Sequence, residues 1–85
     1  MLFKHIDIDW TEWGITLIAR HDVEAYEVEQ IFNDEKLKID RTDKDRQILI
    51  GRTFSGRIIF VVISYPNQQN QRVCQVLCVK SQPLN

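Results

Sequence analysis

The chain has 85 residues, of which 44% are hydrophobic and 27% are charged, and its formal net charge is −1. This composition is typical of a soluble globular protein, and the length fits one domain, residues 1–85, with a single small core. No apolar run reaches the roughly 18 residues that cross a bilayer. Residues 1–10 also lack the apolar core of a signal peptide, so we expect a cytoplasmic protein.

The charges are distributed unevenly along the chain. Residues 1–45 hold all 12 acidic residues and 6 basic ones, a net charge of −6, whereas residues 46–85 hold 5 basic residues and no acidic one. A basic half of this kind favours a polyanionic partner, although the net charge alone argues against nucleic acid. The alternative is that acidic side chains of the first half fold onto the arginines and pair with them.

The first half of the sequence predicts a strand and two helices. Residues 3–10 alternate with a period of two, which indicates a strand with Ile6 and Ile8 facing inward. Thr11 is a favourable N-cap for a helix that runs to about Arg20. A second, amphipathic helix is predicted over residues 24–33. Its apolar stripe would contain Ala25, Val28, Ile31 and Phe32, and its solvent face Glu24, Glu27 and Glu29.

The second half predicts strands over residues 47–54, 57–65 and 72–80, and residues 37–39 suit a short edge strand. Ser55 and Gly56 between the first two strands suggest a two-residue hairpin turn, which would place Gly51 opposite Phe60. Gly51 would then leave room for the aromatic ring, and Leu49 would share the face of Phe60 rather than that of the neighbouring isoleucines. Two cysteines four residues apart are expected on one face of the last strand, about 13 Å apart and too far for a disulfide. They are Cys74 and Cys78.

The order β-α-α-β-β-β, with an additional short edge strand, predicts an α+β fold in which two N-terminal helices pack on a small antiparallel β-sheet. In this arrangement Arg52 and Arg57 lie near the hairpin tip, and Arg46 and Arg72 lie near the opposite end of the sheet. The arginines would therefore mark both ends of the sheet.

Several motifs follow one another in a recognisable order. Trp10 opens the first helix, the run Arg20-His21-Asp22-Val23 breaks it, and Gly51 and Gly56-Arg57 flank the hairpin. Together, the segments DWTEWGITLIARHDVEAYEVEQIF, ILIGRTFSGRIIFVVI and QVLCVK resemble the BrnT family of bacterial toxins, small RelE-like ribonucleases of type II toxin–antitoxin modules. The resemblance covers nearly the whole chain. It implies a RelE-like fold, RNA as the substrate, no metal or other cofactor, and neutralisation by a BrnA-like ribbon-helix-helix antitoxin.

One departure from the family pattern concerns the last strand. The family usually ends this strand with Thr/Ser-Ala-Arg and continues into a terminal helix, whereas here Cys78, Val79 and Lys80 are followed by SQPLN. Apolar area is then expected to stay uncovered, and a homodimer is expected because uncovered apolar area and strand edges favour association. The residues concerned are Val73, Val76, Leu77 and Val79.

Cleavage of RNA requires a base for the 2′-hydroxyl, a cation for the phosphorane and an acid for the leaving oxygen. The resemblance and its near-neutral pKa make His21 the candidate acid/base residue, with Arg57 and Lys80 as the candidate catalytic cations. A plain helix-end role for His21 and solvated strand-end charges are the alternatives. Neither the histidines nor the cysteines have the spacing of a metal site.

Further residues are candidates for RNA contact, three of them through phosphate and one, Tyr65, by stacking on a base. A half-buried structural role is the alternative for the tyrosine. The candidates are Arg20, Arg52, Tyr65 and Arg72. Three functions stay open from the sequence: a ribonuclease toxin, an interaction protein of the same fold without catalysis, and an RNA-binding module that has few aromatic residues for stacking.

Overall fold

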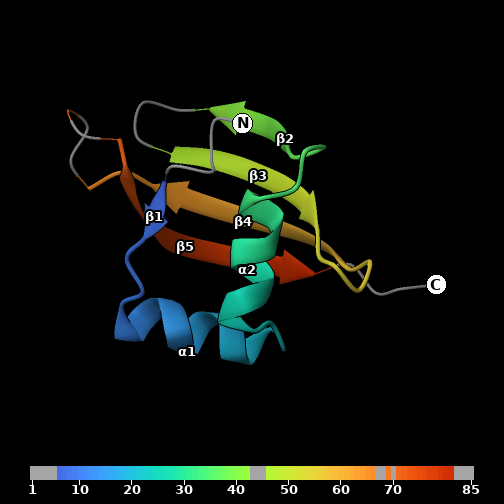
Figure 1. Cartoon of the computed structure of the whole chain (residues 1–85). Coiled ribbons are helices and arrows are strands. Elements are labelled where there is room, and N and C mark those ends of the chain that lie inside the picture. The colour runs from blue at the N-terminus through green and yellow to red at the C-terminus, as the bar shows by residue number, and fades with distance from the viewer. Residues whose placement is uncertain (1–5, 43–45, 67–68, 70, 82–85) are drawn as a thin grey trace.

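The computed structural model describes residues 6–42, 46–66, 69 and 71–81. Its elements, in chain order, are β1 (Asp7–Ile8), α1 (Glu12–Arg20), α2 (Ala25–Phe32), β2 (Lys38–Thr42), β3 (Arg46–Arg52), β4 (Ile58–Ser64) and β5 (Val73–Ser81) (Figure 1). The strands form one sheet in the order β1-β5-β4-β3-β2. The predicted α+β fold is confirmed, and the sheet is antiparallel from β2 to β5, while β1 adds one parallel pairing with β5.

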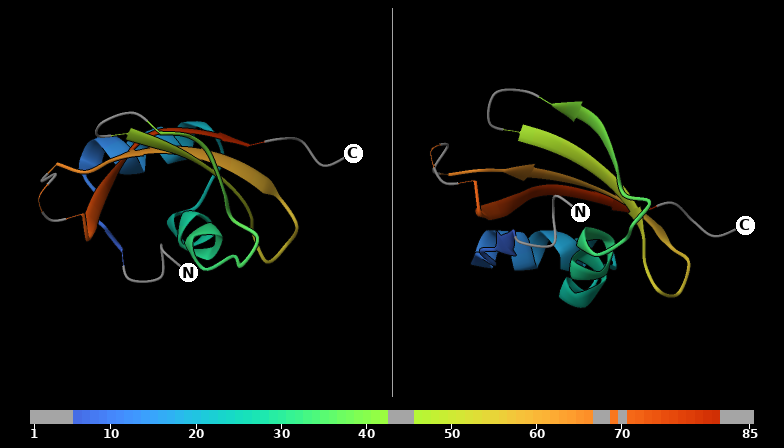
Figure 2. Two further views of the ribbon diagram at one scale, coloured as in Figure 1. Left: turned by 90° about the horizontal axis from the view of Figure 1, so that it is seen from above. Right: turned by 45° about the horizontal axis from the view of Figure 1, so that its top comes forward.

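Both helices lie on one side of the sheet, and the strands curve over them (Figure 2). The core fills the space between these layers, where Leu49 and Val61 from the sheet meet Ile18 of α1 and Val28 and Ile31 of α2. We call the other side of the sheet the open face. No helix within the described residues is long and apolar enough to cross a bilayer.

The two helices begin and end close to where the sequence predicts. Thr11 caps α1, and its hydroxyl oxygen accepts the N–H of Gly14 at 3.0 Å. Ile6 and Ile8 pack against the core as predicted, although residues 3–5 of the expected first strand lie outside the described residues. Local signals for caps and apolar stripes therefore located the helical layer.

The β3–β4 hairpin differs from the prediction by one residue. Thr53 and Arg57 close it through an N–H···O bond of 2.8 Å, so the loop has three residues and ends at Gly56, whose φ is 96°. Three-residue loops of this kind need a left-handed residue before the returning strand, and glycine adopts that conformation without steric cost. The prediction of a two-residue turn was therefore wrong. Leu49 consequently lies opposite Val61 on the buried face.

The shifted register also changes the role of Gly51. It pairs with Ile59 rather than Phe60, and it faces α2. A Cβ atom at this position would lie 2.6 Å from Cβ of Ile31, closer than real Cβ contacts come. Gly51 therefore lets α2 approach β3, instead of making room for an aromatic ring as the sequence suggested.

A bulge in β5 corrects two further expectations. Val62 pairs with Cys78, whereas Ile63 pairs with Val76, so one extra residue of β5 lies between these pairs. The bulge reverses the alternation of side chains: Cys74 is buried and Cys78 is exposed, and the two thiols do not share a face. It also turns both Val76 and Val79 into the core, so only Val73 of the valines expected to be uncovered is exposed.

Candidate functional site

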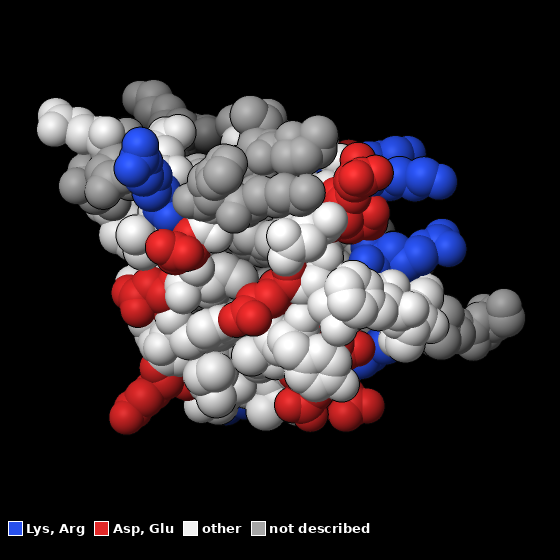
Figure 3. Space-filling model, viewed as in Figure 1, with Lys and Arg blue, Asp and Glu red and all other residues white. Residues whose placement is uncertain are grey.

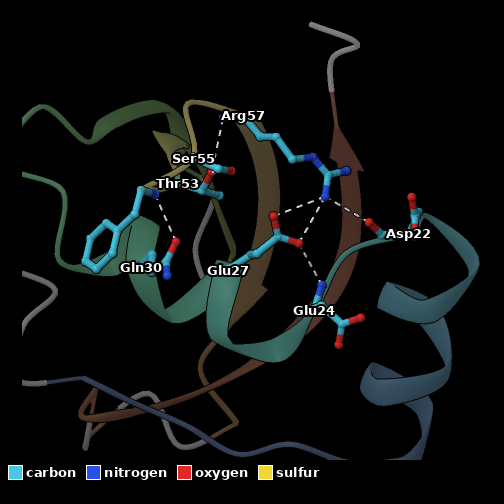
Figure 4. A network of polar contacts seen from close by, with 8 residues as sticks. Asp22, Glu24, Glu27, Gln30, Thr53, Ser55 and Arg57 are labelled. Atoms are coloured by element: carbon cyan, nitrogen blue, oxygen red, sulfur yellow. Dashed lines mark hydrogen bonds and ion pairs between the residues drawn. The ribbon is translucent and has the colours of Figure 1, made fainter.

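An ion pair joins the start of β4 to the helical layer. Arg57 donates through Nη1 to both carboxylate oxygens of Glu27, at 3.0 and 3.1 Å, and to the main-chain oxygen of Asp22 at 2.9 Å (Figure 4). The side chain of Arg57 is 23% exposed and that of Glu27 only 7%. Arg57 thus connects β4, α2 and the α1–α2 connection at one point. We call this the Glu27–Arg57 network.

Glu27 was predicted to lie in solvent, and this was wrong. Its Oε1 also accepts the N–H of Glu24 at 3.0 Å, which completes a capping box at the start of α2. One carboxylate therefore satisfies a free helix N–H and neutralises a half-buried arginine, and both bonds compensate for its burial. The sequence signal was a glutamate at the third position of a helix, which typically turns back toward the N-cap.

Among the residues that the structure describes, none accepts a hydrogen bond from the rest of the Arg57 guanidinium. The bonds to Glu27 and Asp22 all use Nη1, while Nε and Nη2 carry the other three N–H groups. Nη2 points away from Glu27 (Figure 4). Arg57 is therefore held in one orientation by its carboxylate partner while it presents further donors to an anion.

His21 and Arg20 lie at the same junction of the helices. His21 is the exposed C-cap residue of α1, and its main-chain N–H donates to Ile18 at 3.1 Å. Asp22, whose carbonyl binds Arg57, follows in a left-handed conformation with φ 57°. Arg20 is exposed in the last turn of α1. The chain thus brings His21 and Arg57 to the same end of the helical layer.

Lys80 lies on the other side of the sheet from Arg57. It pairs with Phe60, Phe60 pairs with Ile50, and Ile50 pairs with Lys38, so these four residues form a row across β5, β4, β3 and β2. Paired residues share a face, and this row is on the open face because Val79 next to Lys80 is buried against the helices. The three residues predicted for catalysis therefore do not converge on one side of the sheet.

A hollow of about 390 Å³ opens beside this row at the hairpin end of the sheet. Arg52 belongs to the same face, because it pairs with Ile58. Basic side chains project from this end of the molecule (Figure 3). We call this site the basic hollow. It is lined by Asp34, Lys36, Lys38, Ile50, Gly51, Arg52 and Ile58.

Asp34 joins the two walls of the basic hollow. Oδ1 accepts the N–H of Lys36 at 2.9 Å, and Oδ2 accepts the N–H of Arg52 at 3.0 Å. These bonds fasten the α2–β2 connection to the end of β3. The hydrogen bond from Lys36, with that from Arg52 and the charges of both residues, lowers the pKa of Asp34 below its ordinary value of 3.8 against a smaller opposing effect of burial. Asp34 is thus ionised, and its two hydrogen bonds hold the α2–β2 connection against the end of β3.

Two of the predicted RNA contacts lie elsewhere. Tyr65 is only 6% exposed, and its hydroxyl donates to Oε1 of Gln47 at 2.7 Å, so its ring is packed within the fold and does not present a face to a base. Burial also raises the pKa of Tyr65. Arg72 is exposed just before β5, at the end of the sheet away from the hairpin. Its carbonyl accepts the N–H of Asp7 at 2.7 Å.

Sequence reasoning found Arg52 and Lys80 but missed Lys36 and Lys38. They were hidden in a charged stretch in which acidic and basic residues alternate, and only the pairing of Lys38 with Ile50 places it on the open face. Within the described ranges, no three His, Cys, Asp or Glu side chains come together as metal ligands do. Burial raises the pKa of the Cys74 thiol to about 12, which keeps it protonated.

Comparison with known proteins supports the fold. No protein-family model matches the sequence, and no curated protein matches it either. The structure, however, is similar to the 1.1 Å crystal structure of the Brucella abortus ribonuclease toxin BrnT, with a TM-score of 0.66 and 23% sequence identity. The match covers 93% of this chain and 99% of that chain. The chain therefore has the BrnT-like fold that the sequence resemblance implied.

Proposed function

We propose that this protein is a ribonuclease toxin that cleaves RNA and is neutralised by an antitoxin. The observation that carries the proposal is the similarity to the Brucella ribonuclease toxin, which extends over 93% of this chain. The uneven charge of the sequence supports it, because the part that forms β3 to β5 has no acidic residue. A cationic sheet of this kind suits a polyanion such as RNA.

In this proposal His21 and Arg57 carry the chemistry. The exposed imidazole of His21 takes the proton of the 2′-hydroxyl and then gives it to the leaving 5′-oxygen. The Nε and Nη2 donors of Arg57 stabilise the negative charge that develops on the phosphate oxygens. Glu27 acts as a positioning residue that holds the guanidinium through Nη1. Arg20, at the same junction, contacts phosphate. Lys80 contributes charge from the open face rather than beside Arg57.

The partner proposed is a ribbon-helix-helix antitoxin of the BrnA type. It would cover the basic sheet and stabilise the folded toxin by mass action. The expected homodimer stays a prediction, and the burial of Val76 and Val79 removes much of the apolar surface on which it was based. Sedimentation of the purified chain at about 100 μM tests it, because the association of small uncovered patches depends on concentration.

A second candidate function is an interaction protein that binds the antitoxin without cutting RNA. The observation that favours it is the position of Lys80 on the opposite side of the sheet from Arg57. Lysine also lacks the planar fork with which arginine grips a phosphate at two points. This protein would keep partner binding and lack catalysis.

An RNA-degradation assay with the purified protein separates the two functions. We expect the wild type to cleave RNA, and His21→Ala to reduce the rate by about 10² or more, which is the usual contribution of a positioned acid or base. Circular dichroism should show an intact fold, since His21 is exposed. Full activity of the variant would return His21 to a helix-end role. A wild type that binds the antitoxin but cleaves no RNA would establish the second function instead.

A further inference from the structure

The basic hollow is separate from the Glu27–Arg57 network, and its lining holds more cationic than acidic side chains. Arg52, Lys36 and Lys38 line it, and none of them forms an ion pair within the described part of the chain. Asp34 is the acidic residue of the lining, and each of its oxygens already accepts a main-chain N–H. The hollow is thus lined by three cationic side chains and one carboxylate, so its lining keeps a net positive charge for an anion.

An exposed aromatic ring lies two residues beyond Arg52. Phe54 is 83% exposed, the highest value among the exposed large hydrophobic residues that the structure describes. Its main chain is bonded to α2, because the N–H of Phe54 donates to Oε1 of Gln30 at 2.9 Å. The preceding residue, Thr53, shares a hydroxyl hydrogen bond of 2.9 Å with Ser55. A single exposed apolar side chain is common on its own, but this one lies two residues along the chain from Arg52, which lines the hollow.

We propose that the basic hollow and Phe54 form a binding site for single-stranded RNA, in which the hollow holds phosphate and sugar and the ring of Phe54 stacks on a base. This inference rests on the proposed function and names the part of the surface that holds the substrate. Proteins that bind single strands combine a cationic groove along the backbone with aromatic rings that stack on unpaired bases. A duplex keeps its bases stacked and has none free for the ring.

The dimensions and lining of the hollow fit this ligand. A volume of about 390 Å³ is within the range of small-molecule sites and accommodates one nucleotide. Ile50 and Ile58 give it an apolar floor for the sugar, while Arg52 and Lys38 stand on the same face for the phosphates. Gly51 makes this geometry possible, since the close approach of α2 to β3 positions the connection that carries Lys36.

The test is fluorescence anisotropy with a fluorescein-labelled, 2′-O-methyl oligouridine of about ten nucleotides, which binds as a single strand but has no free 2′-hydroxyl for self-cleavage. The matched pair of charge variants is Arg52→Ala and Arg46→Ala, which remove exposed arginines from opposite ends of β3. We expect Arg52→Ala to weaken binding and to flatten the dependence of log K on log salt by about 0.7, the value for one lost contact with a single strand. Arg46→Ala should leave both unchanged.

The matched aromatic pair is Phe54→Ala and Trp13→Ala, because Trp13 is also exposed, at 57%, but lies on α1. We expect Phe54→Ala to bind the oligonucleotide about 5-fold more weakly, because one stacked base is lost, and to keep the wild-type salt dependence. Trp13→Ala should bind as the wild type does. The same oligonucleotide annealed to its complement should bind more weakly than the single strand and show no dependence on Phe54.

Four results would overturn the inference. One is that both Arg52→Ala and Phe54→Ala bind the oligouridine with wild-type affinity. The proposed ribonuclease function would still hold in that case if the protein cleaves RNA. Another is equal binding of the duplex, which would make the hollow a general phosphate site. The third is poly-glutamate binding as tightly as the oligouridine, which would identify the site as one for an acidic protein segment. If the wild type neither binds the oligouridine at about 50 mM salt nor cleaves RNA, both proposals fail.

Discussion

Arg52 and Arg57 lie five residues apart on either side of one hairpin, yet their surroundings differ in almost every respect. The guanidinium of Arg57 is half-buried, paired with Glu27 and bonded to a carbonyl. That of Arg52 is exposed and forms no ion pair among the described residues, and only its main chain is held, by Asp34. One arginine is oriented by its partner, whereas the other is free to meet a ligand.

The difference shows that one residue type meets two different environments within a small domain. A half-buried charge loses part of its hydration, and this loss destabilises the fold. A partner of opposite charge and hydrogen bonds are needed to compensate for it. The pair then fixes a position and helps to define the packing of α2 on β4. An exposed charge contributes little to stability, so it is available for binding. The Glu27–Arg57 network should therefore respond to mutation through stability, and the basic hollow through affinity.

The largest expected effect comes from Glu27→Ala. It leaves Arg57 half-buried without its counter-charge and removes the capping bond to Glu24, so we expect unfolding to become easier by about 2–4 kcal/mol. Urea denaturation measures this change. Glu27→Gln keeps the cap and should cost less. Arg52→Ala, as the exposed counterpart, should alter stability by no more than about 0.5 kcal/mol. Equal losses for Glu27→Ala and Arg52→Ala would contradict the contrast.

A smaller loss is expected for Gly51→Ala, which touches both regions. The added Cβ atom would lie 2.6 Å from Cβ of Ile31, so α2 must move away from β3, at a cost of about 1–3 kcal/mol. The double variant with Ile31→Ala should not recover stability, because alanine keeps the Cβ atom that clashes. Recovery in the double variant would show that the outer part of the isoleucine, rather than the backbone spacing, sets the limit.

The smallest effect is expected for Asp34, whose contribution to the stability of the fold depends on pH. Because the folded pKa of Asp34 is lowered by its bonds to Lys36 and Arg52, the unfolded state binds more protons near pH 3.8. The contribution of this carboxylate to stability is thus present above that pH and is lost as the pH falls through the folded pKa. Asp34→Asn removes the contribution, so stability should decline less steeply between about pH 5 and pH 3 than in the wild type. Unchanged slopes would show that these bonds do not stabilise the fold.

The sequence was sufficient for the helical layer because caps and apolar stripes act locally. Thr11 and the stripe that includes Val28 and Ile31 lie where the pattern predicts. The sheet was less predictable, because one residue more in the hairpin loop moved Leu49 to the opposite face. The bulge in β5 did the same for Cys78, and no local signal marks the bulge.

The site was predictable only in part for the same reason. Arg57 and His21 share one end of the helical layer, but Lys80, the third catalytic candidate, lies across the sheet from them. The sequence pattern placed Glu27 on the solvent side of its helix, because its partner Arg57 is 30 residues away in the chain and the pattern of the helix alone does not indicate it. Which charged side chains form ion pairs and which stay exposed therefore depends on contacts between residues that are far apart in the sequence.

The central claim is that Arg57 serves catalysis and Arg52 serves binding, and the kinetics of single-stranded RNA cleavage test it most directly. The two variants are Arg57→Lys, which keeps the charge but loses the planar fork, and Arg52→Ala. We predict that Arg57→Lys lowers kcat by about 10² with little change in KM, and that Arg52→Ala raises KM while kcat at saturating RNA stays near the wild-type value. The account would be contradicted by the reverse assignment, by equal effects of both variants on kcat, or by a wild-type protein that cleaves no RNA.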